Sequence, residues 1–183
     1  MAKFAEPVQP RKPMSSVLID MHLPSAADTE LLGAALARSL PADDFAAVLY
    51  LKGDLGAGKT TCVRALLRTL GIVRRVRSPT YTLVETYAAA ELTCVHVDLY
   101  RLSGEAEAEA LGLRDLADMN SLLLVEWPEK GAAAVPRPDV ELHLDYEGDG
   151  RLARLSSFTG RGERWLDKLG YDSTLALYVS NIT

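Results

Sequence analysis

The sequence predicts a single α/β domain in which helices flank a central, mostly parallel sheet and a hairpin lies near the C-terminal end. Residues 45–51 form an almost unbroken apolar run, which is typical of a strand covered on both faces. A glycine-rich loop joins this run to an expected helix at 60–70, and a second apolar run occupies residues 122–125. A length of 183 residues suffices for one domain of this kind.

The first elements of the chain set this pattern. Residues 17–23 alternate between apolar and polar side chains like a strand. Residues 28–40 place leucines on one helical face, with Asp28 as the expected N-cap. A strand followed by a helix begins an α/β unit. Gly71 is expected to end the helix at 60–70, because glycine commonly follows a helix C-terminus.

Two hairpins and further helical structure follow in the second half of the chain. Residues 82–87 and 92–99 predict two strands joined by a short turn. Helical structure is expected at 105–119. Residues 140–146 and 152–158 alternate around a Gly-Asp-Gly turn, which is a hairpin signature.

We expect the folded domain to occupy residues 16–170, with a short closing helix at 161–169. Residues 1–15 carry three prolines among charged side chains. They predict a loose leader, because proline is excluded from helix interiors and central strands. Residues 171–183 form a C-terminal tail to which the sequence assigns no role.

The composition argues against several classes of protein. A formal net charge of -5 and a pI near 5.2 argue against a chain that coats nucleic acid unaided, since phosphate binding needs a clustered basic face. Cys62 and Cys94 lie far apart inside apolar runs and are expected to be buried free thiols. The apolar runs are far shorter than the roughly 20 residues that cross a bilayer, and the N-terminus lacks an apolar signal core. We therefore expect a cytoplasmic protein without membrane contact.

The glycine-rich loop has the chemistry of a phosphate cradle. Gly53, Gly56 and Gly58 allow a tight turn with backbone N–H groups pointing inward, and the following helix adds the positive end of its dipole. Lys59 supplies a charge for the β- and γ-phosphates of a nucleotide, and the Thr60 hydroxyl is suited to bind Mg²⁺. The chain has no Asn/Thr-Lys-x-Asp element of the kind used for GTP, so ATP is the expected nucleotide. The loop residues predicted to bind ATP are Gly53, Leu55, Gly56, Ala57, Gly58, Lys59, Thr60 and Thr61.

Two acidic residues end strands beside this P-loop. Glu126 follows the apolar run at 122–125, and Asp98 follows a similar run at 94–97. Because ligands of open α/β sheets lie beyond the carboxyl ends of the strands, both carboxylates are candidates to reach the nucleotide. The alternative is a solvated acid at a strand end. His96, flanked by valines, is interpreted as a packed or capping residue rather than a catalyst.

A hydroxyl-rich segment at 77–82 follows the P-loop helix and contains one proline. In P-loop proteins this position often holds a switch that becomes ordered with the nucleotide. An ordinary turn held by serine and threonine side chains is the alternative. Arg74, Arg75 and Arg77 form the only dense basic cluster of the sequence, and their spacing favours a solvated surface over a local contact for RNA or an acidic partner.

Four motifs, in this order along the chain, resemble one known family. They are Gly-Asp-Leu-Gly-Ala-Gly-Lys-Thr-Thr at 53–61, Ser-Pro-Thr-Tyr-Thr-Leu-Val at 78–84, His-Val-Asp-Leu-Tyr-Arg-Leu at 96–102 and Val-Glu-Trp-Pro-Glu-Lys at 125–130. The chain thereby resembles the bacterial TsaE ATPases of tRNA threonylcarbamoyladenosine biosynthesis. The resemblance extends from about residue 25 to about residue 169, and the last three motifs are far more specific than the P-loop.

The resemblance implies roles for individual residues. Thr60 and Glu126 would hold Mg²⁺, Asp98 would support hydrolysis, and Lys59 would complete the catalytic set. The implied switch residues are Ser78, Pro79, Thr80 and Tyr81. Beyond these motifs, Thr29 and Arg151 are the nearest matches to a threonine and a basic residue that the family uses for the nucleotide, and Trp127 matches the family's Glu-Trp pair.

The resemblance also implies partners. The family ATPase joins a complex of two proteins, a threonylcarbamoyl transferase catalytic subunit and its paralogous partner, and reaches tRNA only through that complex. ATP hydrolysis resets the complex between cycles. Two other functions share the same P-loop: a small-molecule kinase that transfers the γ-phosphate to a bound acceptor, and a non-catalytic assembly factor that needs ATP only for binding. The sequence lacks an obvious arginine-rich lid of the kind that such kinases use.

Overall fold

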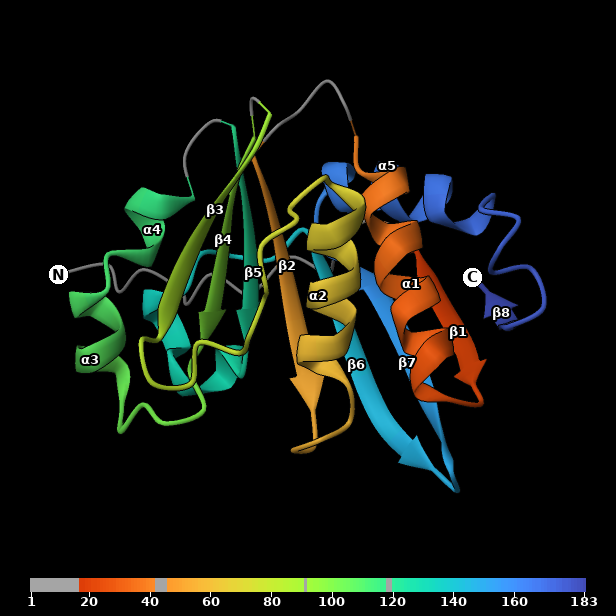
Figure 1. Ribbon diagram of the computed structural model, residues 1–183, viewed down its shortest axis with the longest axis horizontal. Coiled ribbons are helices and arrows are strands. Elements are labelled where there is room, and N and C mark those ends of the chain that lie inside the picture. The colour runs from red at the N-terminus through yellow and green to blue at the C-terminus, as the bar shows by residue number, and fades with distance from the viewer. Residues whose placement is uncertain (1–16, 42–45, 91, 118–119) are drawn as a thin grey trace, which may run out of the picture.

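The computed structural model describes residues 17–41, 46–90, 92–117 and 120–183 (Figure 1). The expected leader at 1–15 lies outside these ranges. The strands are β1 (Leu18–Leu23), β2 (Ala47–Gly53), β3 (Val84–Ala89), β4 (Leu92–Asp98), β5 (Ser121–Glu126), β6 (Val140–Glu147), β7 (Gly150–Ser157) and β8 (Val179–Ile182). The helices are α1 (Ala26–Ser39), α2 (Lys59–Thr69), α3 (Glu105–Ala110), α4 (Leu113–Leu116) and α5 (Gly160–Gly170), with short 3-10 helices η1 (Pro128–Lys130) and η2 (Ala132–Ala134).

All eight of these strands join one sheet in the order β3-β4-β5-β2-β6-β7-β1-β8. The four central strands, β4, β5, β2 and β6, run parallel to one another. At one edge β3 pairs antiparallel with β4, and beyond β6 the strands β7, β1 and β8 follow in antiparallel pairs. The structure therefore confirms the predicted α/β domain with its parallel centre and its C-terminal hairpin, β6–β7. The antiparallel flanks make the sheet as a whole mixed.

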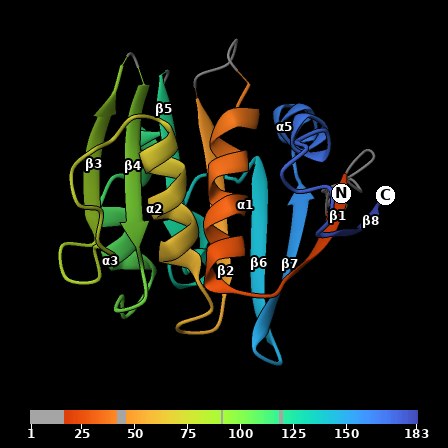
Figure 2. The same cartoon turned by 45° about the vertical axis from the view of Figure 1, so that its right-hand side comes forward.

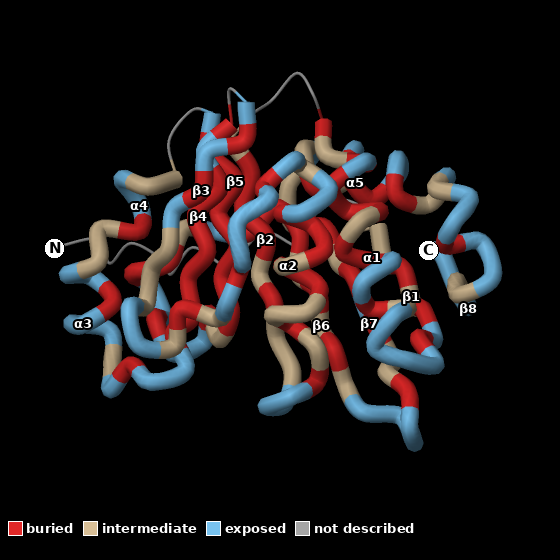
Figure 3. Tube along the Cα trace, viewed as in Figure 1, coloured by how far each residue is buried: buried red, intermediate tan, exposed pale blue. Residues whose placement is uncertain are grey.

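Two hydrophobic cores hold helices against opposite faces of this sheet. On one face α1, α2 and α5 pack together, as two views show (Figures 1 and 2). On the other face α3, α4 and η2 pack over β4 and β5. Successive residues of β5 alternate between the two cores: Leu122 and Leu124 join the first, and Leu123 and Val125 the second. This double burial explains the unbroken apolar runs: β5 is buried along its whole length, and β4 is buried at all but one position (Figure 3).

Helix α1 begins earlier than predicted, because its N-cap is Ser25 and not Asp28. Asp28 is the third residue of the helix, and its carboxylate accepts hydrogen bonds from the Ser25 backbone N–H at 2.8 Å and from the Ser25 hydroxyl at 2.6 Å. The bond from the Ser25 side chain is the main cause that lowers the pKa of Asp28. An acid at this position is therefore a capping-box partner rather than the cap itself.

The helical stretch predicted at 105–119 is divided into α3 and α4. Gly112 lies between them with a φ of 61°, a left-handed backbone conformation that interrupts a right-handed helix. Residues 118 and 119 lie outside the described ranges. Among the helices of the described chain, none has the length and apolar character that crossing a membrane requires.

The C-terminal tail has a structural role that the sequence did not reveal. β8 pairs antiparallel with β1 and forms an edge of the sheet. Leu175 is only 1% exposed and belongs to the core beneath α1 and α5, and Asp172 forms an ion pair with Arg38 of α1 at 2.9 Å. The tail therefore packs against the domain instead of extending away from it.

We expect Leu175→Ala to lower the free energy of unfolding by about 2–4 kcal/mol, because it removes a buried side chain and leaves a cavity. Leu177→Ala is the matched control, since Leu177 is 96% exposed; its effect should stay within about 0.5 kcal/mol. Urea unfolding followed by circular dichroism measures both. Equal stability of the two variants would contradict a role for the tail in the core.

Candidate functional site

The carboxyl ends of three neighbouring parallel strands converge at one edge of the sheet. β2 ends at Gly53, β4 at Asp98 and β5 at Glu126, and the register places Asp98 directly beside Glu126. A pocket of about 410 Å³ opens at this edge. It is lined by Leu55, Gly56, Gly58, Lys59, Thr60, Thr61, Ser78, Thr80, Asp98, Tyr100, Arg101, Glu126 and Trp127. The structure thus brings the P-loop, both acids and part of the predicted switch into one cavity, as the topology of open α/β sheets leads one to expect.

The P-loop requires glycine at its two ends. Gly53 has a φ of 116°, and a Cβ there would lie 1.9 Å from the carbonyl oxygen of Leu144. Gly58, the N-cap of α2, has a φ of 117°. No side chain caps the N-terminus of α2. Its first backbone N–H groups and the positive end of its dipole therefore remain available to an anion.

The Lys59 side chain is folded back into the loop. Its ammonium donates to the backbone carbonyls of Gly53 at 2.6 Å and Asp54 at 2.8 Å, and it lies 4.0 Å from the centre of the Trp127 ring. Burial lowers the pKa of Lys59, and the charges of Glu126 and Asp98 oppose this shift. The ammonium is therefore held in a defined place by weak, replaceable partners.

Two polar side chains, those of Thr60 and His96, position the Glu126 carboxylate. The Thr60 hydroxyl donates to both of its oxygens, at 2.9 and 3.1 Å. His96 is fully buried, and its Nε2 lies 2.8 Å from Glu126 Oε1 while its Nδ1 has no partner. An imidazole with the proton on Nε2 fits this arrangement, because Nε2 then donates to the carboxylate. His96 is thus packed, as its neighbours predicted, and it also orients the acid.

Asp98 holds the predicted switch segment. Its carboxylate accepts hydrogen bonds from the hydroxyls of Ser78 and Thr80, the latter at 3.0 Å, and from the backbone N–H of Tyr100 at 3.0 Å. The segment therefore lies against the end of β4. Pro79 is buried outside the cavity, whereas Tyr81 is 84% exposed and stacks beneath the Arg101 guanidinium at 4.3 Å.

Four predicted nucleotide residues lie beside the cavity without lining it: Thr29, Gly53, Ala57 and Arg151. Thr29 is buried next to Gly58, and its hydroxyl oxygen has no hydrogen-bond partner. Arg151 donates from Nε to the carbonyl of Ala57 at 3.0 Å and lies over the Tyr146 ring. The β6–β7 hairpin thus supports the P-loop from outside.

The sequence analysis did not predict Tyr100, Arg101 and Tyr146 as site residues, although the first two lie in the motif at 96–102. Tyr100 packs against Trp127, with ring centres 5.0 Å apart, and Tyr146 donates to the carbonyl of Leu55 at 3.3 Å. For Tyr100 and Arg101 a signal existed: residues directly after a strand that ends in an acid lie at the same edge as that acid. No comparable signal marks the tip of a hairpin.

The oxygen donors of the pocket suit Mg²⁺. Thr60, Glu126 and Asp98 offer one hydroxyl and two carboxylates, and Mg²⁺ is commonly held by one or two carboxylates together with substrate phosphates. Among the described residues no group of three or more histidine, cysteine, aspartate or glutamate side chains lies together in a way that could hold a metal ion.

Comparisons with known proteins agree with the resemblance seen in the four motifs. The family model described as "Threonylcarbamoyl adenosine biosynthesis protein TsaE" matches residues 23–154. Similar proteins named tRNA threonylcarbamoyladenosine biosynthesis protein TsaE occur in Haemophilus influenzae and Streptomyces coelicolor. The Haemophilus protein is 45% identical over 64% of this chain and 75% of its own length. The Streptomyces protein is 39% identical over 73% of this chain and 91% of its own length. The crystal structure of Bacillus subtilis YdiB has the same fold, with a TM-score of 0.69, 24% identity, and coverage of 86% of this chain and 97% of that one.

Proposed function

The chain belongs to the TsaE family, and from this premise we propose that it is a magnesium-dependent ATPase that supports threonylcarbamoyl transfer to adenosine in tRNA. The observation that carries the proposal is the meeting of a P-loop with two strand-end carboxylates, Asp98 and Glu126, in one cavity. A phosphate cradle alone binds a nucleotide. Hydrolysis also needs a carboxylate for the metal and a group that orients water.

Binding of ATP begins with the loop and α2. The N–H groups at the start of α2 receive the phosphates, and Lys59 exchanges the carbonyls of Gly53 and Asp54 for phosphate oxygens. This exchange is favourable because the ammonium then pairs with negatively charged oxygens instead of neutral carbonyls. Thr29 and Arg151 act from behind the loop: the buried Thr29 hydroxyl lies next to Gly58 without a partner, and the Arg151 guanidinium donates to the Ala57 carbonyl.

The metal ligands are Thr60 and Glu126. Mg²⁺ would supply charge neutralisation for the phosphates during hydrolysis. The hydrogen bond between the Thr60 hydroxyl and Glu126 keeps both donors together before the ion arrives. His96 fixes one carboxylate oxygen from the buried side, so the free lone pairs of Glu126 face the cavity.

Asp98 and the segment at 78–81 couple the nucleotide to the surface. Asp98 would orient the attacking water as a hydrogen-bond acceptor. The hydroxyls of Ser78 and Thr80 are bound to Asp98 in this structure, and a γ-phosphate would compete for them. Exchange between these partners would move Pro79 and the exposed Tyr81, which makes the segment a switch.

The biological role that fits this site is action within a complex of partner proteins. We assign the threonylcarbamoyl transferase catalytic subunit and its paralogous partner protein as the binding partners, in the cytoplasm, with tRNA modified by their complex. The relatives' names support the pathway, and the surface position of Tyr81 supports a switch that reports outward.

Removal of the charge of Glu126 and of Asp98 should produce different defects in ATP binding and hydrolysis. Glu126→Gln should weaken Mg²⁺-dependent ATP binding, because it removes a metal ligand. Asp98→Asn should leave binding largely intact and lower kcat about 100-fold or more, since the loss falls on the transition state. ATP binding with and without Mg²⁺, together with phosphate release, separates the two effects. Reversed phenotypes would mean that the two roles are exchanged.

Thr80 should matter more for the complex than for ATP affinity. With the transferase complex, tRNA and ATP, the wild-type chain should permit repeated rounds of modification, and Thr80→Ala should reduce those rounds while ATP binding changes little. Modified adenosine per transferase over time is the measurement. A non-hydrolysable ATP analogue is the control, because it should stop the cycle if turnover is needed.

Equal multiple-turnover yields with wild type, Thr80→Ala and no added chain would contradict the proposed role. Full activity with the non-hydrolysable analogue would instead favour a non-catalytic assembly factor.

A further inference from the structure

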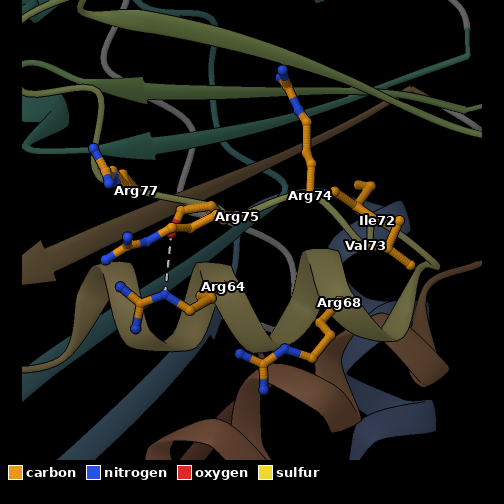
Figure 4. Close-up of a pocket in the computed structure, with 8 residues that line it drawn as sticks. Arg64, Arg68, Ile72, Val73, Arg74, Arg75 and Arg77 are labelled. Atoms are coloured by element: carbon orange, nitrogen blue, oxygen red, sulfur yellow. Dashed lines mark hydrogen bonds between the residues drawn. The ribbon is translucent and has the colours of Figure 1, made fainter.

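A second cavity, of about 620 Å³, lies on the surface outside the nucleotide pocket. It is formed between α2 and the segment 72–77, which leads from that helix toward the switch (Figure 4). Eight residues line it, and five of them are arginines: Arg64, Arg68, Arg74, Arg75 and Arg77. The cavity is referred to below as the arginine pocket.

Local packing explains why the arginines gather. Arg64 and Arg68 are four residues apart on α2, so they share one face of the helix. In the segment opposite, Ile72 and Val76 are buried and anchor the backbone, which leaves Arg75 exposed. Figure 4 shows Arg64 and Arg75 directed toward one another across the pocket.

The positive charge of this pocket is poorly compensated by the protein itself. Arg68 has a distant ion pair with Glu30, at 3.9 Å. Arg74 donates to the Thr86 carbonyl at 2.5 Å, lies over the Tyr87 ring at 4.1 Å and pairs with Glu85 at 3.6 Å. Neither acid lines the pocket. Arg64 donates only its Nε, to the carbonyl of Val76 at 3.3 Å. For Arg75 and Arg77 the described structure records no hydrogen bond or ion pair.

The sequence reinforces this imbalance. Between Asp54 and Glu85 the chain has six basic residues and no acidic one, although its net charge is -5. Like charges this close repel one another, so clustering them carries an electrostatic cost that a bound polyanion would relieve.

We propose that the arginine pocket binds the phosphodiester backbone of RNA. The guanidinium group matches phosphate oxygens with paired N–H donors, and one flexible strand brings consecutive charges into a single hollow. Only three residues of the lining are apolar, Ile72, Val73 and Val76, so the pocket offers no aromatic anchor for a protein partner.

The choice of RNA over other polyanions rests on the proposed function, which places the chain in a complex that acts on tRNA. The contact is expected to be weak and independent of sequence, with a dissociation constant on the order of 10⁻⁴ to 10⁻⁶ M, because few phosphates are engaged. The segment that carries Arg74, Arg75 and Arg77 continues directly into Ser78. RNA bound here is therefore adjacent to the switch.

The test measures binding of a transcribed tRNA to the full chain over a range of salt concentrations, without ATP. Arg68→Ala/Arg75→Ala removes two charges and no hydrogen bond that holds the segment. This double variant should bind at least about tenfold more weakly at low salt, and the slope of log K against log salt should become shallower by about 1.5 to 2. Arg154→Ala/Lys168→Ala is the matched control, since neither residue lines the pocket.

Wild-type affinity and slope in the pocket variant, or an equal loss in the control, would overturn the proposal. Displacement of tRNA by polyglutamate at equal charge would also overturn it, because the pocket would then recognise carboxylates as well as phosphates. ATP binding, measured in the same samples, should be unchanged. Absent ATP binding in the wild type would refute the proposed function and leave the RNA result standing.

Discussion

The parallel register of β4, β5 and β2 is the constraint on which the site depends. It ends three neighbouring strands at one edge, so that a glycine loop, Asp98 and Glu126 meet although they are far apart in the sequence. The strands are held in register by burial on both faces, because a slip by one residue would exchange the side chains of the two cores. The chemistry at the edge is therefore fixed by apolar packing beneath it.

The polar groups at this edge stabilise one another before any ligand is present. Lys59 uses loop carbonyls, Thr60 and His96 use Glu126, and the switch hydroxyls use Asp98. Buried polar groups without partners are destabilising, so these contacts stabilise the arrangement. Each contact is also one that a phosphate or a metal ion can replace, which links the fold to the proposed ATP cycle.

Most of the fold followed from the sequence because its signals were local. Apolar runs marked the buried strands, and the P-loop motif marked α2. The errors arose where local rules compete: Asp28 fits an N-cap as well as a capping-box partner, and Gly112 interrupts a stretch of good helix formers. β8 has almost no buried residues, so its sequence shows no alternation of apolar and polar side chains that would predict a strand. The sequence marked one side of the arginine pocket, the basic cluster at 74–77, but not Arg64 and Arg68 on the other side, because only the fold places the two segments face to face.

Calorimetric titration of Mg-ATP into the wild-type chain and Lys59→Ala tests the central claim most directly. The wild type should bind, and the variant should bind at least about tenfold more weakly, because the only buried ammonium of the described site is gone. Lys168→Ala is the control for a lost charge on the surface and should bind like the wild type. Unchanged affinity in Lys59→Ala, with an unchanged circular dichroism spectrum, would contradict the assignment of this loop as the nucleotide site.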